Sequence, residues 1–117
     1  MKNLIGGRLV DASDGKVIEV TNPATGELID TVPNATEQDV DVCVKEAAKA
    51  QKEWAKMPMH ERGDILYKFV DLVETKKEEL AQLLSKETGK PIKEARDEIG
   101  NIRTFVGGYV EKAKHEY

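Results

Sequence analysis

The order of the secondary-structure signals is the feature that most constrains the fold of this chain. Residues 1–35 carry short extended segments separated by turn residues, whereas residues 36–117 carry apolar residues at helical spacing. Because strands come first and helices follow without alternation, a parallel sheet with helical crossovers is excluded. We therefore predict an α+β arrangement, in which an antiparallel strand region (1–35) precedes a region of three amphipathic helices (36–117). The two regions together would form one incomplete domain.

The extended segments of the first region are typical of short strands. Residues 17–21 alternate with a period of two, and residues 28–32 form a second extended run. Between these runs, Pro23 fixes its own φ and Gly26 permits a positive φ, which favours a compact connection. Residues 17–32 are therefore expected to form one hairpin-like unit.

Three helices are expected in the second region. The first follows the N-cap residue Thr36 and runs for about five turns. The second is long, begins near Pro58 and ends at Gly89, with a polar turn over residues 74–79. The third begins at Pro91. One apolar stripe is predicted along the second helix, formed by Ile65, Leu66, Phe69, Val70, Leu72 and Val73 and continued by Leu80, Leu83 and Leu84.

The third helix has two unusual features. Gly107 and Gly108 interrupt its helix propensity, at a cost of about 1 kcal/mol each relative to alanine. A glycine pair within a strongly periodic helix indicates close packing against a bulky neighbour. The chain also stops at Tyr117 without a C-cap residue, and a helix that lacks its stop signal is expected to be truncated.

Composition excludes several classes of function. The formal net charge is -4, and Asp and Glu interleave with the lysines, so no basic face for a nucleic-acid partner is expected. No apolar run approaches the roughly 20 residues that a membrane span needs, and no signal peptide is visible at the start. The single cysteine excludes an internal disulfide. The expected location is the cytoplasm.

No complete catalytic set is present in the sequence. Cys43 falls inside the first predicted helix without a histidine nearby, so a buried structural thiol is expected. His60 and His115 lack companions at metal-ligand spacing and are expected at the surface. Glu87 lies just before Gly89, where a carboxylate beside free helix carbonyls can help to bind a hard cation.

A series of short motifs runs through nearly the whole chain in a fixed order. They are Ile5-Gly6-Gly7, Asn22-Pro23-Ala24-Thr25-Gly26-Glu27, Thr36 with Asp39-Val40, the helix up to Trp54, Glu61-Arg62 with Ile65-Leu66, Glu87-Thr88-Gly89-Lys90-Pro91, and Glu94-Ala95. In this order and with these separations, the motifs resemble the opening segment of the NAD(P)-dependent aldehyde dehydrogenase superfamily. Each motif is modest by itself, so the ordered series carries the resemblance.

The resemblance implies that the chain is the N-terminal fragment of a longer enzyme, which oxidises an aldehyde to a carboxylic acid with NAD or NADP. The family's catalytic cysteine, general-base glutamate and oxyanion-hole asparagine lie beyond this segment. No catalytic or cofactor-binding residue is therefore assigned here, and the segment alone is expected to be inactive and to bind no cofactor. Its expected partner is the remainder of the enzyme chain, where the helices would pack against a Rossmann-type sheet of the α/β coenzyme-binding domain.

The resemblance also implies two sites to which this segment contributes. Some family members bind a monovalent cation through backbone carbonyls at the positions of Val20 and Thr21 and a carboxylate at the position of Glu87. The third helix approaches the substrate entrance in the family, so Ile102 and Phe105 are expected to line that entrance. The aldehyde itself and the choice between NAD and NADP depend on later parts of the enzyme.

Two other interpretations of the chain remain open from sequence. It could be a free-standing helical interaction module derived from such an enzyme, or a regulatory subunit that pairs with a separate catalytic chain. Either would use helix faces that the missing domain normally covers. Because large exposed apolar patches promote association, we expect the isolated chain to form homo-oligomers or to exchange elements between copies.

Overall fold

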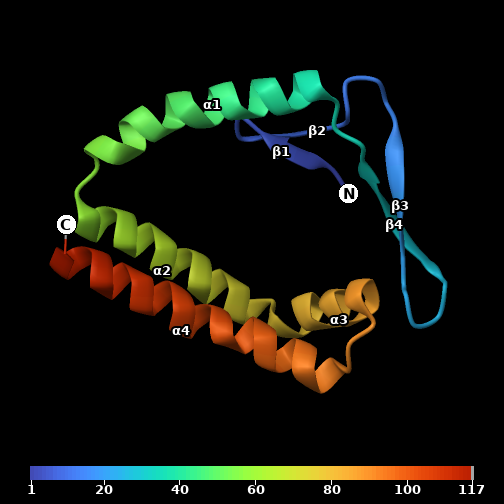
Figure 1. The fold of residues 1–117 in the computed structure, drawn as a ribbon. Coiled ribbons are helices and arrows are strands. Elements are labelled where there is room, and N and C mark those ends of the chain that lie inside the picture. The colour runs from blue at the N-terminus through green and yellow to red at the C-terminus, as the bar shows by residue number, and fades with distance from the viewer. Residues whose placement is uncertain (117) are drawn as a thin grey trace. The chain divides into compact units, whose positions relative to one another are not determined.

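The computed structural model describes residues 1–116 of the chain (Figure 1). This part contains two pairs of antiparallel strands followed by four helices. The residues group into two compact units, Met1–Lys56 and Met57–Tyr117. The first unit holds the strands and one helix, and the second holds the other three helices. The predicted α+β class and the order of strands before helices are confirmed.

The first strand pair is a tight hairpin. Strand β1 (Asn3–Ile5) pairs with β2 (Arg8–Val10), and Ile5 stands opposite Arg8, so only Gly6 and Gly7 form the turn. Their φ angles are 59° and 76°. A two-residue hairpin turn with positive φ at both central positions strongly favours glycine, which explains the Gly-Gly pair.

The second strand pair confirms the predicted hairpin-like unit. Strand β3 (Val17–Thr21) runs antiparallel to β4 (Leu28–Pro33), and the register is irregular between Val20 and Thr21. The connection is closed by two backbone bonds, in which the Gly26 N–H donates to the Asn22 carbonyl at 2.7 Å and the Asn22 N–H donates to the Glu27 carbonyl at 2.8 Å. The predicted compact connection is therefore present.

Helix α1 (Glu37–Lys56) begins with a reciprocal cap and confirms the first predicted helix. The Asp39 N–H donates to Thr36 Oγ1 at 3.1 Å, and the Thr36 N–H donates back to Asp39 Oδ2 at 2.8 Å. The Ser13 N–H donates to the same Asp39 oxygen at 3.1 Å. These hydrogen bonds, first from Thr36 and then from Ser13, lower the pKa of Asp39. One carboxylate thus ties the loop before β3 to the start of α1.

The second unit consists of α2 (Met59–Thr75), α3 (Lys77–Thr88) and α4 (Ile92–Glu116). Helix α4 runs antiparallel along α2, and α3 packs against α4 (Figure 1). The buried hydrophobic side chains of this unit are small, which lets the helices approach closely. They are Val70, Val73, Ala81, Ala95 and Val110.

The prediction of one long second helix is wrong, because the structure has two helices, α2 and α3, in this stretch. Lys76 separates the two helices with φ -108° and ψ 13°, and its N–H donates to the Val73 carbonyl at 3.1 Å. Residues 74–79 contain no apolar side chain that could hold a straight helix against α4. The chain therefore turns within this polar stretch, and α3 packs its own apolar face, with Ala81 fully buried.

The glycine pair of α4 meets two different environments. A Cβ added at Gly107 would lie 3.7 Å from the Tyr67 ring, which is an ordinary van der Waals contact. A Cβ added at Gly108 would meet no atom within 4 Å. The predicted packing against a bulky neighbour is therefore found at Gly107, whereas Gly108 lies open within the second unit.

Replacing Gly108 with alanine is expected to stabilise the second unit by about 1 kcal/mol, because alanine has higher helix propensity and the added methyl group meets nothing. The free energy of unfolding can be measured by urea titration followed by circular dichroism. A loss of stability would show that another part of the protein packs closely against Gly108.

Two arginines of α4 bind carboxylates of the neighbouring helices. Arg96 donates from Nε and Nη2 to the two carboxylate oxygens of Glu78 at 2.9 and 2.8 Å. Arg103 binds Glu74 through two nitrogens and also donates to Asp71 at 2.6 Å. The hydrogen bonds from Arg96 and, to a smaller extent, from Gln82 lower the pKa of Glu78 from 4.5 to about 2. These ion pairs fix the register of α4 against α2 and α3.

The Glu78 ion pair predicts a specific dependence of stability on pH. Because its folded pKa lies below the ordinary value, the pair stabilises the unit above pH 4.5, and this contribution disappears as the pH falls toward about 2. The pair is exposed, so the effect is small. Urea midpoints measured across this range should fall less steeply for Glu78→Gln than for the wild type. Coinciding curves would contradict the prediction.

Candidate functional site

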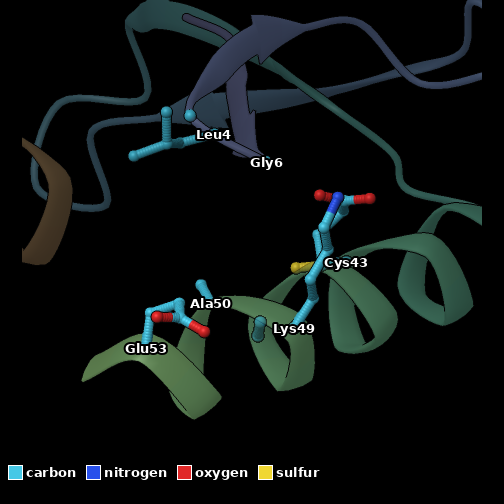
Figure 2. Close-up of a pocket in the computed structure, with 9 residues that line it drawn as sticks. Leu4, Gly6, Cys43, Lys49, Ala50 and Glu53 are labelled. Atoms are coloured by element: carbon cyan, nitrogen blue, oxygen red, sulfur yellow. The ribbon is translucent and has the colours of Figure 1, made fainter. Parts of the chain in front are cut away.

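An open cleft of about 460 Å³ lies within the first unit, between the β1–β2 hairpin and α1 (Figure 2). Leu4 and the Gly6–Gly7 turn form one side of the cleft, and α1 forms the other. The α1 side combines small apolar side chains with charged ones. These residues are Cys43, Glu46, Ala47, Lys49, Ala50 and Glu53.

The hairpin turn approaches α1 closely at this cleft. A Cβ added at Gly6 would lie 3.3 Å from Glu46 Oε2, which is tighter than most real contacts. Because the exposed end of Glu46 can shift by a few tenths of an ångström, the positive φ of Gly6 remains the main reason for glycine at this position. The glycine turn lets the hairpin lie against α1 without displacing Glu46.

The chemistry available in the cleft does not include a nucleophile–base pair. Cys43 is a free, half-buried thiol that lines the cleft (Figure 2), so the predicted full burial is not found. Activation of a thiol requires a neighbouring base, cation or helix N-terminus, and residues 1–56 contain no histidine. Cys43 also lies well inside α1, away from its N-terminus. The cleft therefore offers Cys43 neither a histidine nor a helix N-terminus, and its charged side chains near the thiol are those of Glu46 and Lys49.

A second, more apolar groove of about 350 Å³ lies between α2 and α4 in the second unit. Its lining contains no charged side chain and only one hydroxyl group, so it suits an apolar occupant. The lining residues are Met59, Leu66, Val106, Tyr109, Val110 and Ala113.

The residues predicted to bind a cation lie in different units. Val20 and Thr21 belong to β3, at the irregularity of the strand register, and such irregularities leave backbone groups outside the regular ladder. Glu87 is exposed and lies next to the last residue of α3. Within residues 1–116, no group of three or more His, Cys, Asp or Glu side chains is placed to hold a metal ion. The monovalent-cation site stays a prediction.

The residues predicted at the substrate entrance lie one turn apart on α4. Ile102 is half-buried, whereas Phe105 is 63% exposed and lines a shallow groove with Tyr109 and Gly108. This groove would need a further element to become an enclosed entrance. The substrate-entrance role of Ile102 and Phe105 also stays a prediction.

Comparison with known proteins identifies the family to which these elements belong. Residues 9–117 match the sequence model of the aldehyde dehydrogenase family. The chain belongs to the aldehyde dehydrogenase family. The resemblance inferred from the ordered motifs is thereby confirmed.

Relatives of this aldehyde dehydrogenase chain are similar over nearly all of its length. D-glyceraldehyde dehydrogenase (NADP(+)) of Picrophilus torridus is 42% identical over 95% of this chain and 22% of its own length. Mitochondrial succinate-semialdehyde dehydrogenase of Oryza sativa subsp. japonica is 41% identical over 99% of this chain and 22% of its own. The NADP complex of an NADP-dependent glyceraldehyde-3-phosphate dehydrogenase from Bacillus halodurans C-125 matches with a TM-score of 0.93, at 31% identity over 96% of this chain and 24% of that chain.

The aldehyde dehydrogenase chain therefore spans about a quarter or less of the length of these relatives. None of its helices within residues 1–116 is long and apolar enough to cross a membrane. The place of Leu4 in the cleft and the hydrogen bond between Ser13 and Asp39 were not predicted from sequence. The Thr36–Asp39 spacing signalled a local cap, but no sequence rule indicated that the same carboxylate would also bind Ser13.

Proposed function

We propose that this chain is the leading part of an NAD(P)-dependent aldehyde dehydrogenase, an enzyme that oxidises an aldehyde to a carboxylic acid. The observation that carries the proposal is the family match over residues 9–117, combined with relatives named as aldehyde and semialdehyde dehydrogenases. One relative and one structural neighbour are named for NADP, which supports a nicotinamide cofactor for the whole enzyme. The cytoplasmic location stays a prediction, and the aldehyde and the choice between NAD and NADP were not predicted from this segment.

The segment would act as scaffold rather than as the catalytic centre. Its only thiol, Cys43, has no histidine in the first unit, and its exposed apolar side chains on α1, α2 and α4 form surfaces for further structure to cover. The remainder of the enzyme chain would supply the nucleophile and the cofactor site. The 117-residue chain alone is therefore proposed to be inactive.

A chimeric enzyme tests this proposal directly. The matching segment of the Picrophilus torridus relative is replaced by this chain, and NADP-linked oxidation of D-glyceraldehyde is measured. We expect the chimera to be active and the isolated chain to be inactive. A matched chimera that carries the corresponding segment of the rice relative shows whether the Picrophilus torridus enzyme stays active with a segment from another family member. A soluble but inactive chimera, beside an active control, would overturn the proposal and favour an interaction module or regulatory subunit.

The isolated chain is expected to self-associate, because large apolar side chains remain exposed on both units. Leu4 and Val44 in the first unit and Phe105 and Tyr109 in the second are each more than half exposed. Sedimentation velocity at micromolar concentration should therefore detect dimers or larger species. A single monomeric species over a wide concentration range would contradict the expected homo-oligomer.

A further inference from the structure

The loop between β2 and β3 contains the one Asp-Gly pair of the sequence, Asp14-Gly15 (Figure 1). Both residues are exposed, and Gly15 has a φ of 72°. An aspartate followed by glycine is particularly prone to isomerisation, because glycine has no Cβ that would hinder the approach of its nitrogen to the aspartate side chain. Loops with few buried contacts are also the parts of a fold that open most easily. The pair therefore combines a reactive sequence with an exposed position.

The isomerisation of such a pair needs only water besides the chain. The Gly15 nitrogen attacks Cγ of the Asp14 carboxylic acid, so that an N–Cγ bond forms and the hydroxyl group leaves with the amide proton as water. Water then opens the succinimide ring. Addition at Cγ restores aspartate, whereas addition at the main-chain carbonyl carbon gives isoaspartate, in which the main chain runs through Cβ and Cγ. The composition is unchanged, but the main chain gains a methylene group.

Hydrogen bonds keep the two reacting groups of the pair apart in the folded loop. The Gly15 N–H donates to the Ala12 carbonyl at 2.9 Å. The Asp14 Oδ1 atom accepts from the Lys16 N–H at 2.9 Å. Both bonds must break, and the main chain must rotate at Asp14, before the nitrogen can reach Cγ. Isomerisation in the folded chain therefore requires a local opening of the loop.

The residues on either side of the pair are anchored to other elements. The Ser13 N–H donates to Asp39 Oδ2 at 3.1 Å, which ties it to the start of α1. On the other side, the Lys16 carbonyl accepts from the Asn34 N–H at 2.9 Å, just after β4. The Asp14-Gly15 pair is thus a short bridge between two fixed points. Loss of either anchor gives the pair more freedom to open.

We propose that Asp14-Gly15 is an isoaspartate-forming site, and that the Asp39 carboxylate keeps the conversion slow through its hydrogen bond to Ser13. The conversion proceeds from the open loop, so its rate follows the population of that state. Once isoaspartate has formed, the bridge is longer by a methylene group while its two ends are still fixed. One of the anchors at Ser13 and Lys16 is therefore expected to release.

Ageing of the 117-residue chain at neutral pH and raised temperature tests the site. A protease that cleaves before aspartate but not before isoaspartate follows the conversion, and water enriched in heavy oxygen labels every chain that has passed through the succinimide. We expect cleavage before Asp14 to be lost with time, while cleavage before Asp11 and Asp30 persists, and the label to enter residue 14. In urea, where the folded loop no longer protects the pair, the loss should be faster. Cleavage before Asp14 that persists in urea as it does before Asp11 would overturn the site.

Asp39→Ala tests the protecting role of the carboxylate. We expect isoaspartate to form at residue 14 at least about threefold faster than in the wild type, because a lost hydrogen bond to a charged group raises the open population by this order. Asp39→Asn retains one acceptor oxygen and should give an intermediate rate. Amide hydrogen exchange of α1 identifies the variants that remain folded, so the milder variant keeps the test decisive if Asp39→Ala unfolds.

Two matched variants separate protection of the loop from stability of α1. Thr36→Ala removes the hydroxyl group that caps α1 but keeps the carboxylate that binds Ser13. Asp41→Ala removes a nearby exposed carboxylate of the same helix. Both variants should isomerise more slowly than Asp39→Ala. Rates for the folded Asp39 variants that do not exceed those of Thr36→Ala and Asp41→Ala would overturn the protecting role.

Discussion

Val70→Asp is expected to disrupt the Met57–Tyr117 unit. Val70 is 1% exposed and is one of the two largest fully buried side chains. An ionised carboxylate at this position has no buried cation to pair with, and burying it costs several kcal/mol. A unit of this size gains roughly 3–5 kcal/mol from its core, so the penalty is comparable with its whole stability. Amide hydrogen exchange should show that α2 and α4 lose their protection.

The matched control for this substitution is Leu72→Asp. Leu72 lies two residues further along the same helix and is 57% exposed. In the isolated chain, an exposed substitution of this kind changes the free energy of unfolding by only about 0.5 kcal/mol or less. Equal losses of protection for Val70→Asp and Leu72→Asp would contradict the assignment of inner and outer faces.

The positions of most elements could be predicted from local patterns. The N-cap at Thr36 and the apolar spacing after Pro91 correctly located α1 and α4, because caps and helical periodicity act over a few residues. The connection around Gly26 correctly indicated the β3–β4 hairpin. The break at Lys76 was missed, because a polar stretch in a helix is compatible with either a solvated turn or a change of direction. Only the packing of α3 against α4 decides between them.

The faces of α2 show a different limit of sequence reasoning. The apolar residues of α2 were treated as one stripe, but the structure buries Val70 and Val73 while it leaves Ile65, Phe69 and Leu72 exposed. Hydrophobicity alone cannot say which of two adjacent apolar lines is covered within the same unit. Long-range ion pairs such as Arg103 with Glu74 were likewise beyond prediction, because their partners are set by the antiparallel placement of α2 and α4.

The predicted sites rest mainly on the family resemblance. Glu87 was singled out by its position just before Gly89, but its combination with the carbonyls of Val20 and Thr21 came from the family resemblance, since no spacing rule joins residues so far apart in sequence. The same holds for Ile102 and Phe105, whose surroundings on α4 are open. The cleft beside Cys43, by contrast, is a property of the first unit alone. It could not be predicted because it depends on how the hairpin lies against α1.

Gly63→Val is the second substitution for which we expect a large effect. A Cβ added at Gly63 would lie 2.9 Å from Val110 Cγ1, closer than real Cβ contacts, and 3.2 Å from Lys114 Cε, a tight contact that the flexible lysine can relieve. Valine has slightly better helix propensity than glycine, but overpacking a close helix contact typically costs more. We expect a net loss of about 2–3 kcal/mol in the free energy of unfolding of the second unit. Thermal and urea unfolding of the variant and the wild type measure this difference.

A double-mutant cycle identifies the contact that causes the loss. Val110 is fully buried, so Val110→Ala alone is expected to destabilise the unit by about 2–3 kcal/mol. In the double variant, the smaller side chain at position 110 makes room for the larger one at position 63. The combined loss should therefore be smaller than the sum of the single losses by about 1 kcal/mol or more. Strict additivity would show that the two side chains do not meet, and that α4 does not cross α2 at Gly63.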